Sequence, residues 1–184
     1  MGESGKKCLK VVEKTEILLY NISNMFTSLI GHFPSAIDAK KRCVVPAAFR
    51  EALTAENARS VIVSKSPSDK PRELYFFLPS QWELVKQNPV AFLRRFGVSE
   101  GDYDEEYFFG NCFELFLDEH GRILFRQDQL EEAGLGKSIV FIGVNDHGII
   151  RDRDEYETER KAKTLARRRK KEAATGTLLK PERI

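Results

Sequence analysis

The stretch IDAKKRCVVPAAFREAL occupies residues 37–53, and a similar stretch, LDEHGRILFRQDQLEEAGL, occupies residues 117–135. In each, an apolar residue precedes an aspartate, an arginine follows four positions after it, and three strand-forming residues come next. A short helical pattern and then a β-branched strand follow in both copies. The order strand, D-x-x-x-R turn, strand, helix, strand therefore occurs twice, which predicts a fold of two similar halves.

The repeated turns have a physical explanation. An aspartate at the start of a turn accepts backbone N–H bonds, and a glycine permits positive φ before the strand resumes. We predict that Asp38 and Asp118 orient the arginines of their turns, Arg42 and Arg122, through charge-assisted pairs. Such a pair is also a common structural clasp, and it is the occurrence of two copies in the same context that favours a functional site.

The two turns differ at the position before the arginine, where the first copy has Lys41 and the second has Gly121. A lysine at positive φ costs on the order of 1 kcal/mol. Either the first turn has another conformation, or the positive charge of Lys41 serves a function that compensates for the conformational cost.

The remaining pattern predicts a mainly β chain with short helices. Strands are expected at Ser60 to Ser64, Glu73 to Leu78, Tyr107 to Leu117, Ser138 to Gly143 and Gly148 to Ile150, with a helical tail from Asp152 toward Lys171. The predicted organisation is a loose N-terminal extension (1–24), a first unit (30–80), a helical and acidic link (81–110), a second unit (111–154) and a basic C-terminal helix or tail (155–184). The extension is either a lineage-specific arm or a segment upstream of a start at Met25.

The charge of the chain is segregated along its length. The 184 residues carry a formal net charge of +2, yet residues 160–171 hold eight basic residues and no acid, and residues 100–119 hold eight acids and no base. An average charge therefore does not decide whether the protein meets DNA. The basic segment is interpreted either as a second DNA-binding arm or as a solvated tail, and the acidic segment as a solvated loop.

Several classes of protein are excluded by missing motifs. The sequence has no Gly-rich phosphate loop, no H-E-x-x-H and no G-x-S-x-G, so neither an enzyme nor a bound cofactor is expected. Three scattered cysteines and three scattered histidines indicate no metal site and no disulfide framework. No apolar run is long enough to span a bilayer, and no signal peptide is present, which predicts a cytoplasmic protein without a membrane partner.

Three stretches resemble the MraZ family. IDAKKRCVVPAAFREAL is similar to the family's IDxKGRxxxPxxFRExL, LYFFLPSQWELV to its LxLYPxxEWE segment, and LDEHGRILFRQDQLEEAGLGKSIVFIGVNDHGIIRDRDEYE to its second repeat and following strands. The chain departs from the family pattern at Lys41, at Arg126 and at Gln129-Leu130. The last of these suggests that the helix of the second copy is shifted by one residue.

The resemblance implies two tandem swapped-hairpin half-barrels of the SpoVT-AbrB type, forming one pseudo-symmetric barrel with a C-terminal helix. It also implies a nucleoid-associated DNA-binding regulator, expected to repress the division and cell wall gene cluster by binding repeated promoter boxes as a ring-shaped homo-oligomer. Carried over by position, Arg42 and Lys40 match the first family motif and Arg122 matches the second. Lys41 is added on charge grounds, since three consecutive cations suit phosphate and groove contacts.

Double-stranded DNA is thus the expected partner, with the first turn as the stronger contact. The alternative is an AbrB-like protein-interaction or antitoxin-type module without promoter specificity. Two copies of the motif in one chain favour the regulator. An acid–base pair of Asp38 and Asp118 is disfavoured, because an arginine beside a carboxylate lowers its pKa.

Overall fold

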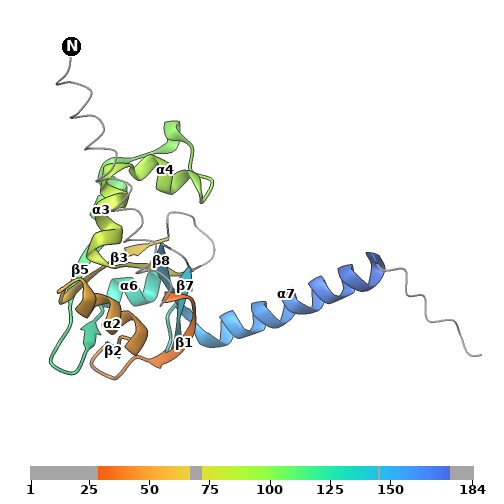
Figure 1. Cartoon of the computed structure of the whole chain (residues 1–184), viewed down its shortest axis with the longest axis horizontal. Helices are drawn as coiled ribbons and strands as arrows, with labels where there is room; N and C mark the ends of the chain where they lie inside the picture. Colours follow the sequence, from red (N-terminus) through yellow and green to blue (C-terminus); the bar gives the residue numbers. More distant parts are fainter. Residues whose placement is uncertain (1–28, 67–71, 145, 175–184) are drawn as a thin grey trace, which may run out of the picture.

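The computed structural model describes residues 29–66, 72–144 and 146–174 (Figure 1). The predicted extension, residues 1–24, lies outside the described residues. The described chain is mainly β with short helices and a long C-terminal helix, as predicted. The strands are β1 (Gly31–Ala36), β2 (Arg42–Val44), β3 (Ser60–Lys65), β4 (Leu74–Phe77), β5 (Cys112–Phe116), β6 (Arg122–Leu124), β7 (Ser138–Val144) and β8 (His147–Asp152). The helices are α2 (Ala47–Ala55), α3 (Pro79–Gln87), α4 (Pro89–Arg94), the 3-10 turn η2 (Glu100–Asp102), α5 (Glu105–Gly110), α6 (Gln127–Glu132) and α7 (Arg153–Ala174).

The strands form one antiparallel six-stranded sheet in the order β1-β7-β8-β4-β3-β5 and a two-stranded sheet of β2 and β6. The counterparts in the two halves are β1 and β5, β3 and β7, and β4 and β8. Exchanging the members of each pair gives the same strand order read in reverse. The first strand of each half pairs with the third strand of the other half, β1 with β7 and β5 with β3. The sequence repeat is therefore a structural repeat whose halves exchange strands.

Helices α2 and α6 occupy the same place in the two halves. Each begins at the same distance from the aspartate of its turn, so the suggested one-residue shift of the second helix is wrong. Pro46 precedes α2 with φ −56°, a value that its ring fixes and that suits a helix start. The helix then buries Phe49, Ala52 and Leu53, which share one face at helical spacing.

The main core lies between the two halves. Phe49 of α2 is fully buried and packs edge to face against Phe76 of β4, with ring centroids 5.2 Å apart. Phe141 of β7, from the second half, lies 5.8 Å from the same ring. Burial of aromatic side chains dominates core energetics, so the halves stabilise each other through shared rings.

A second core cluster lies under the link between the halves. Trp82 of α3, Phe92 of α4 and Phe108 of α5 pack around Tyr75 and Phe77 of β4. The link is thus helical, as predicted, and covers one face of the sheet.

The predicted strand at Tyr107 to Leu117 is wrong in its first part, because α5 ends at Gly110 and β5 begins at Cys112. Asp104 caps α5 by accepting a hydrogen bond from the backbone N–H of Tyr107, and Glu105 and Glu106 occupy the first turn. Acidic residues at a helix N-terminus are favoured by the helix dipole. The aromatic run that indicates a strand is therefore overridden by these helix-start residues.

Candidate nucleic-acid interface

Strands β2 and β6 form a short two-stranded ribbon at one end of the body, called here the ribbon. Arg42 pairs with Leu124, Cys43 with Ile123 and Val44 with Arg122. Cys43 and Ile123 point into the core and are buried. Because successive side chains alternate between the faces of a strand, the two arginines, Val44 and Leu124 share the outer face.

The outer face of the ribbon combines charge with apolar surface. Val44 is 44% exposed and Leu124 is 57% exposed, and each is paired across the ribbon with an arginine. The two halves thus contribute one arginine and one apolar residue each, in a two-fold arrangement.

The first turn, residues 38–42, is held by its aspartate. Asp38 Oδ1 accepts hydrogen bonds from the backbone N–H groups of Lys40 at 2.8 Å and Arg42 at 2.9 Å. Its Oδ2 accepts from Arg42 Nε at 2.9 Å and lies 2.7 Å from Arg42 Nη2. One carboxylate therefore fixes both the backbone of the turn and the guanidinium, and the predicted pair is confirmed.

The second turn, residues 118–122, repeats this geometry. Asp118 Oδ1 accepts from the backbone N–H groups of His120 and Arg122, both at 2.9 Å, and Oδ2 accepts from Arg122 Nε at 2.7 Å. Gly121 has φ 69° and Lys41 has φ 62°. The first turn does not adopt another conformation, so that Lys41 sits in the left-handed region despite its cost.

Each turn is also tied to the opposite half of the chain. The backbone N–H of Val45 donates to the Gly121 carbonyl oxygen at 3.0 Å, and the backbone N–H of Phe125 donates to the Lys41 carbonyl oxygen at 3.0 Å. These two symmetric bonds lock positions 41 and 121 from outside their own turns. Strained backbone persists where the surroundings determine it in this way.

The electrostatics of the turns disfavour a general-acid role for the two aspartates. The hydrogen bond from the Arg42 side chain lowers the pKa of Asp38 to about 2. The backbone hydrogen bond from Arg122 is the main factor that lowers the pKa of Asp118. Both carboxylates are ionised at neutral pH, as predicted from their arginine neighbours.

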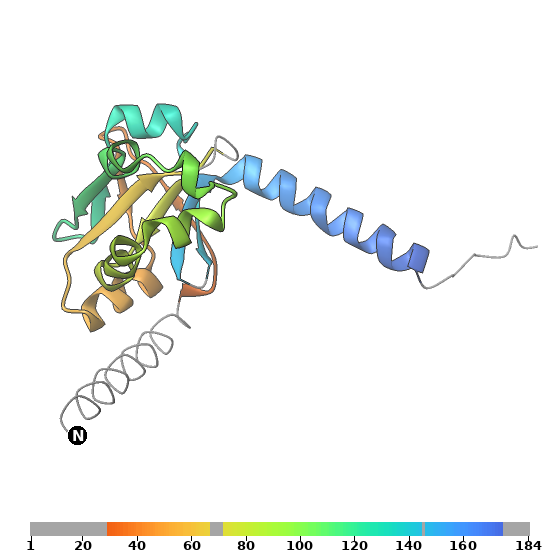
Figure 2. The same cartoon turned by 90° about the horizontal axis from the view of Figure 1, so that it is seen from above.

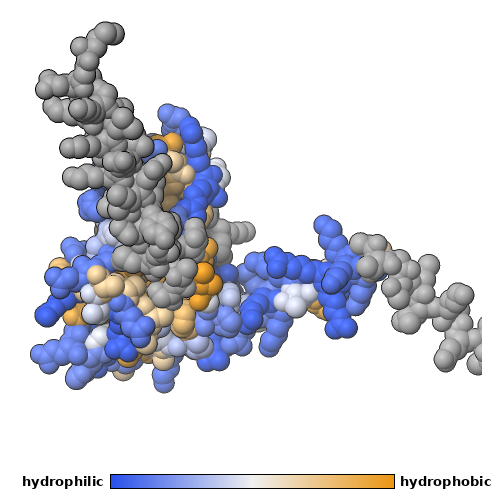
Figure 3. Space-filling model, viewed as in Figure 1, coloured by the Kyte–Doolittle hydropathy of each residue, from blue (hydrophilic) through white to orange (hydrophobic). Residues whose placement is uncertain are grey.

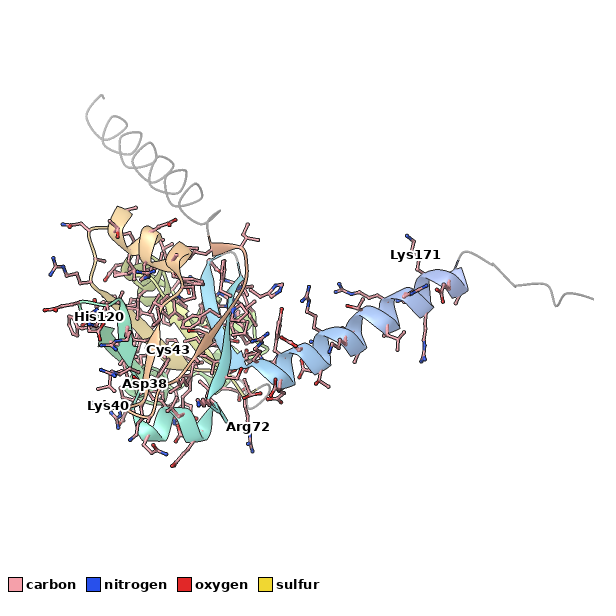
Figure 4. The ribbon with its side chains drawn as sticks, turned by 90° about the horizontal axis from the view of Figure 1, so that it is seen from below. Asp38, Lys40, Cys43, Arg72, His120 and Lys171 are labelled. Atoms are coloured by element: carbon pink, nitrogen blue, oxygen red, sulfur yellow. The ribbon has the colours of Figure 1, made fainter. Side chains whose placement is uncertain are left out.

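The two turns present different charges to solvent. Lys40 is exposed in the first turn, whereas Glu119 and His120 are exposed in the second. Figure 4 places Asp38, Lys40 and His120 at the same end of the body, away from α7. The structure thus brings the predicted residues of both copies to one surface.

Sequence reasoning missed Arg50. A Cβ built on Gly121 would lie 2.6 Å from Arg50 Cδ, so this α2 side chain packs directly over the second turn. Its counterpart in the second half is Leu130, which is buried. The sequence signal that could have identified Arg50 is this difference: the first copy has a cation where the second copy has an apolar residue. It returns positive charge to the turn that carries Glu119.

The part of the chain that the structure describes contains no group of three or more His, Cys, Asp or Glu side chains that could hold a metal ion. Within the same ranges, no helix has the length and apolar character needed to cross a membrane.

Comparisons with known proteins point to one family. The family model described as "MraZ protein, putative antitoxin-like" matches residues 108–178. A Transcriptional regulator MraZ of Desulforapulum autotrophicum is 32% identical over 127 residues, which cover 67% of this chain and 79% of that protein. A Transcriptional regulator MraZ of Burkholderia cenocepacia is 30% identical over 126 residues, covering 68% and 83%, and one of Acidovorax sp. is 29% identical over 127 residues, covering 69% and 84%.

The fold and the ribbon define a class of mainly β proteins whose two similar halves exchange strands and present an aspartate-held arginine each. Within that class, the chain belongs to the MraZ family. The resemblance drawn from the sequence is confirmed.

Proposed function

We propose that this chain is a sequence-specific, DNA-binding transcriptional regulator that contacts duplex DNA through the outer face of the ribbon. The observation that carries the proposal is the pair of arginines held outward by Asp38 and Asp118 at the two ends of an exposed two-stranded ribbon. The relatives named as transcriptional regulators support the same class of function.

The ribbon has the dimensions that the major groove requires. Two paired strands lie about 4.8 Å apart, and the groove of B-DNA, about 12 Å wide, admits a two-stranded β-ribbon. In that position the outward residues meet base edges, while the residues of the turns meet the phosphates on either side. Lys40 and Lys41 suit phosphate contact because they are point charges on flexible stems.

The arginine geometry suits base recognition. The pair with Asp38 uses Nε and Nη2 of Arg42. Within the described residues Nη1 makes no hydrogen bond, so its N–H groups can donate to a ligand. A guanidinium held in place loses less conformational freedom when it binds guanine. Val44 and Leu124 beside the arginines match the apolar contact that a thymine methyl group offers. Lys40, Lys41, Arg42 and Arg122 are therefore proposed as the DNA contacts, the first turn being the stronger.

Family membership extends the proposal to the target and the assembly. We infer a nucleoid-associated cytoplasmic repressor of the division and cell wall gene cluster that binds repeated promoter boxes. A homo-oligomeric ring would present many copies of the first turn to successive boxes. The exchange of β1 and β5 between halves supports the AbrB-like swapped-hairpin arrangement of one pseudo-symmetric barrel. The two units, 30–80 and 111–154, are proposed as its halves.

The deciding experiment has two stages. Fragments of the organism's own genomic DNA are selected on the purified full chain, and enrichment upstream of division and cell wall genes is expected. Arg42→Ala, Arg122→Ala and the charge-preserving Arg42→Lys are then compared on the enriched fragment by gel shift. We expect Arg42→Ala to lower affinity about 10- to 100-fold, the worth of one bidentate arginine–guanine contact. Unchanged affinity in Arg42→Ala, with assembly intact, would contradict the proposal.

The second candidate function is a protein-interaction or antitoxin-type module. The exposed Val44 and Leu124 favour it, because apolar side chains also suit a protein partner. Genomic selection separates the two, since an interaction module enriches no DNA sequence.

A further inference from the structure

The base of α7 is fixed to the sheet. Arg151 of β8 is buried and donates from Nη1 and Nη2 to the Glu159 carboxylate at 3.2 Å and 3.0 Å. Asp152 Oδ1 accepts hydrogen bonds from the backbone N–H groups of Asp154 and Glu155 and so caps the helix. The first turns of α7 are therefore anchored, and the sheet sets the direction of the helix.

The rest of α7 stands clear of the body. Every residue from 160 to 173 is exposed, and Figures 1 and 2 show the helix projecting away from the sheet. A helix of 22 residues is about 33 Å long, of which the exposed part makes up more than half. Figure 4 places Lys171 at the far end of this helix, on the other side of the body from Lys40 and His120.

The exposed part of α7 is strongly cationic, with eight cations and one acidic residue, Glu172. At 3.6 residues per turn, five of its eight cations fall within an arc of about 100°. These five, called here the basic stripe, are Arg160, Lys163, Arg167, Lys170 and Lys171.

Only some of the cations of α7 have an ion-pair partner within the helix. Lys163 pairs with Glu159 and Arg168 with Glu172. Within the residues described, the side chains of Arg167, Arg169 and Lys170 make no hydrogen bond or ion pair. Arg160 Nη1 also donates a hydrogen bond to His32 Nε2 at 3.3 Å. Like charges three or four residues apart destabilise a helix, and the helix dipole stabilises cations only in the last turn. A stripe of five exposed cations on a helix that projects from the body fits an external polyanion.

We propose that the basic stripe of α7 is a second nucleic-acid site, which binds the phosphate backbone of duplex DNA without sequence preference. Because the stripe and the ribbon lie on opposite sides of the body, α7 meets a different stretch of duplex from the one on the ribbon. The chain then bridges two DNA segments. This site goes beyond the proposed function and does not depend on it.

An anionic membrane is the other polyanion to consider. Membrane-surface helices need an apolar face, and Leu165, 49% exposed, is the one large apolar residue among residues 160–173. Figure 3 shows the visible surface of α7 as almost entirely hydrophilic. Duplex DNA is therefore favoured.

The test compares the full chain with a five-fold variant, Arg160→Gln, Lys163→Gln, Arg167→Gln, Lys170→Gln and Lys171→Gln. A matched control exchanges Arg and Lys at the same positions and keeps the charge. Binding to a duplex of arbitrary sequence is measured by fluorescence anisotropy between 50 and 200 mM salt. We expect the slope of log K against log salt to fall by about 2 to 4 in the Gln variant, since each lost phosphate contact removes about 0.9. The control is expected to match the full chain.

Bridging is measured by retention of a labelled duplex on a bead-bound duplex, and it should be lower in the Gln variant than in the control that keeps the charge. Equal salt slopes and equal bridging in the Gln variant and the full chain would overturn the proposal. So would an effect of the substitutions confined to phosphatidylglycerol vesicles or to double-stranded RNA. Helicity of the variants is checked by circular dichroism. The outcome is separable from the ribbon, because Arg42→Ala and Arg122→Ala should leave the α7-dependent part of the salt slope in place.

Discussion

The first and second turns have the same backbone and different surroundings. Both place one residue in the left-handed region, hold an arginine on an aspartate and bond to the opposite half. The first turn adds Lys40 and Lys41, whereas the second adds Glu119 and His120. The conformation is thus required in both halves, while the charge is free to differ. The two turns therefore have the same structural role, and under the proposed function we expect the first turn to bind DNA more strongly.

The strongest way to break this comparison is to give the first turn the residues of the second. Ala39→Glu, Lys40→His and Lys41→Gly together remove two cations and add an acid. We expect affinity for the enriched DNA to fall about 100-fold and the salt slope to fall by about 2, as two phosphate contacts are lost. Gel shifts across a salt series measure both. The reverse exchange, Glu119→Ala with His120→Lys, should raise affinity, and an unchanged affinity would show that the second turn does not contact DNA.

The next largest effect should come from Gly121→Lys, which makes the second turn resemble the first. A side chain at φ 69° is strained, and its Cβ would lie 2.6 Å from Arg50 Cδ. We expect a loss of about 1 to 2 kcal/mol in the free energy of unfolding, measured with urea. Adding Arg50→Ala should recover part of that loss. No recovery would mean that Arg50 does not restrict the second turn.

A smaller effect is expected from Lys41→Gly. Glycine removes the left-handed strain at φ 62° but increases the entropy of the unfolded chain, so that stability should rise by at most about 1 kcal/mol. Loss of one cation should lower DNA affinity several-fold at low salt. A gain in stability together with unchanged DNA affinity would show that Lys41 has no contact with DNA.

The smallest effect separates the two aspartates. Arg42→Ala should raise the pKa of Asp38 from about 2 toward 3.8, because the hydrogen bond from the Arg42 side chain is the main cause of the lowered pKa. Arg122→Ala should move Asp118 less, since a backbone hydrogen bond comes first there. Carboxyl carbon shifts between pH 6 and pH 2 measure both. The folded pKa of Asp38 lies below its unfolded value, so its contribution to stability is full above about pH 4 and falls as the pH approaches 2. Equal pKa changes of Asp38 and Asp118 in the two variants would show that the two arginine side chains act equally on their aspartates.

Much of the fold was predictable from local pattern. The repeat, the aspartate-held arginines, α2 and the C-terminal helix all follow from residues close together in the sequence. The paired strands of different halves do not, because β1 and β7 are more than a hundred residues apart and no local pattern specifies that partner. The strand predicted from Tyr107 failed because aromatic residues favour strands, while the cap at Asp104 decided the local structure.

The candidate site was predictable in part. Asp38, Arg42 and their counterparts were found, since the motif carries its own geometry. The outer face of the ribbon needed the register of β2 against β6, which places Val44 beside Arg122. Arg50 needed the packing of α2 over the opposite turn. Both are contacts between the two halves, and local sequence pattern does not predict such contacts. The domain boundaries and the role of each site residue stay predictions.

The exchange of strands between halves has a consequence for synthesis. Strand β1 leaves the ribosome well before β7, its partner in the sheet. At 5 to 20 residues per second, the roughly 100 residues between them take about 5 to 20 s to make. During that time β1 is an unpaired strand in a crowded cell. Its sequence, GHFPSA, carries Pro34 in the middle, and a proline blocks the ladder by which another chain would add to the strand. We therefore expect Pro34 to disfavour the addition of another strand to β1 until the second half has been made.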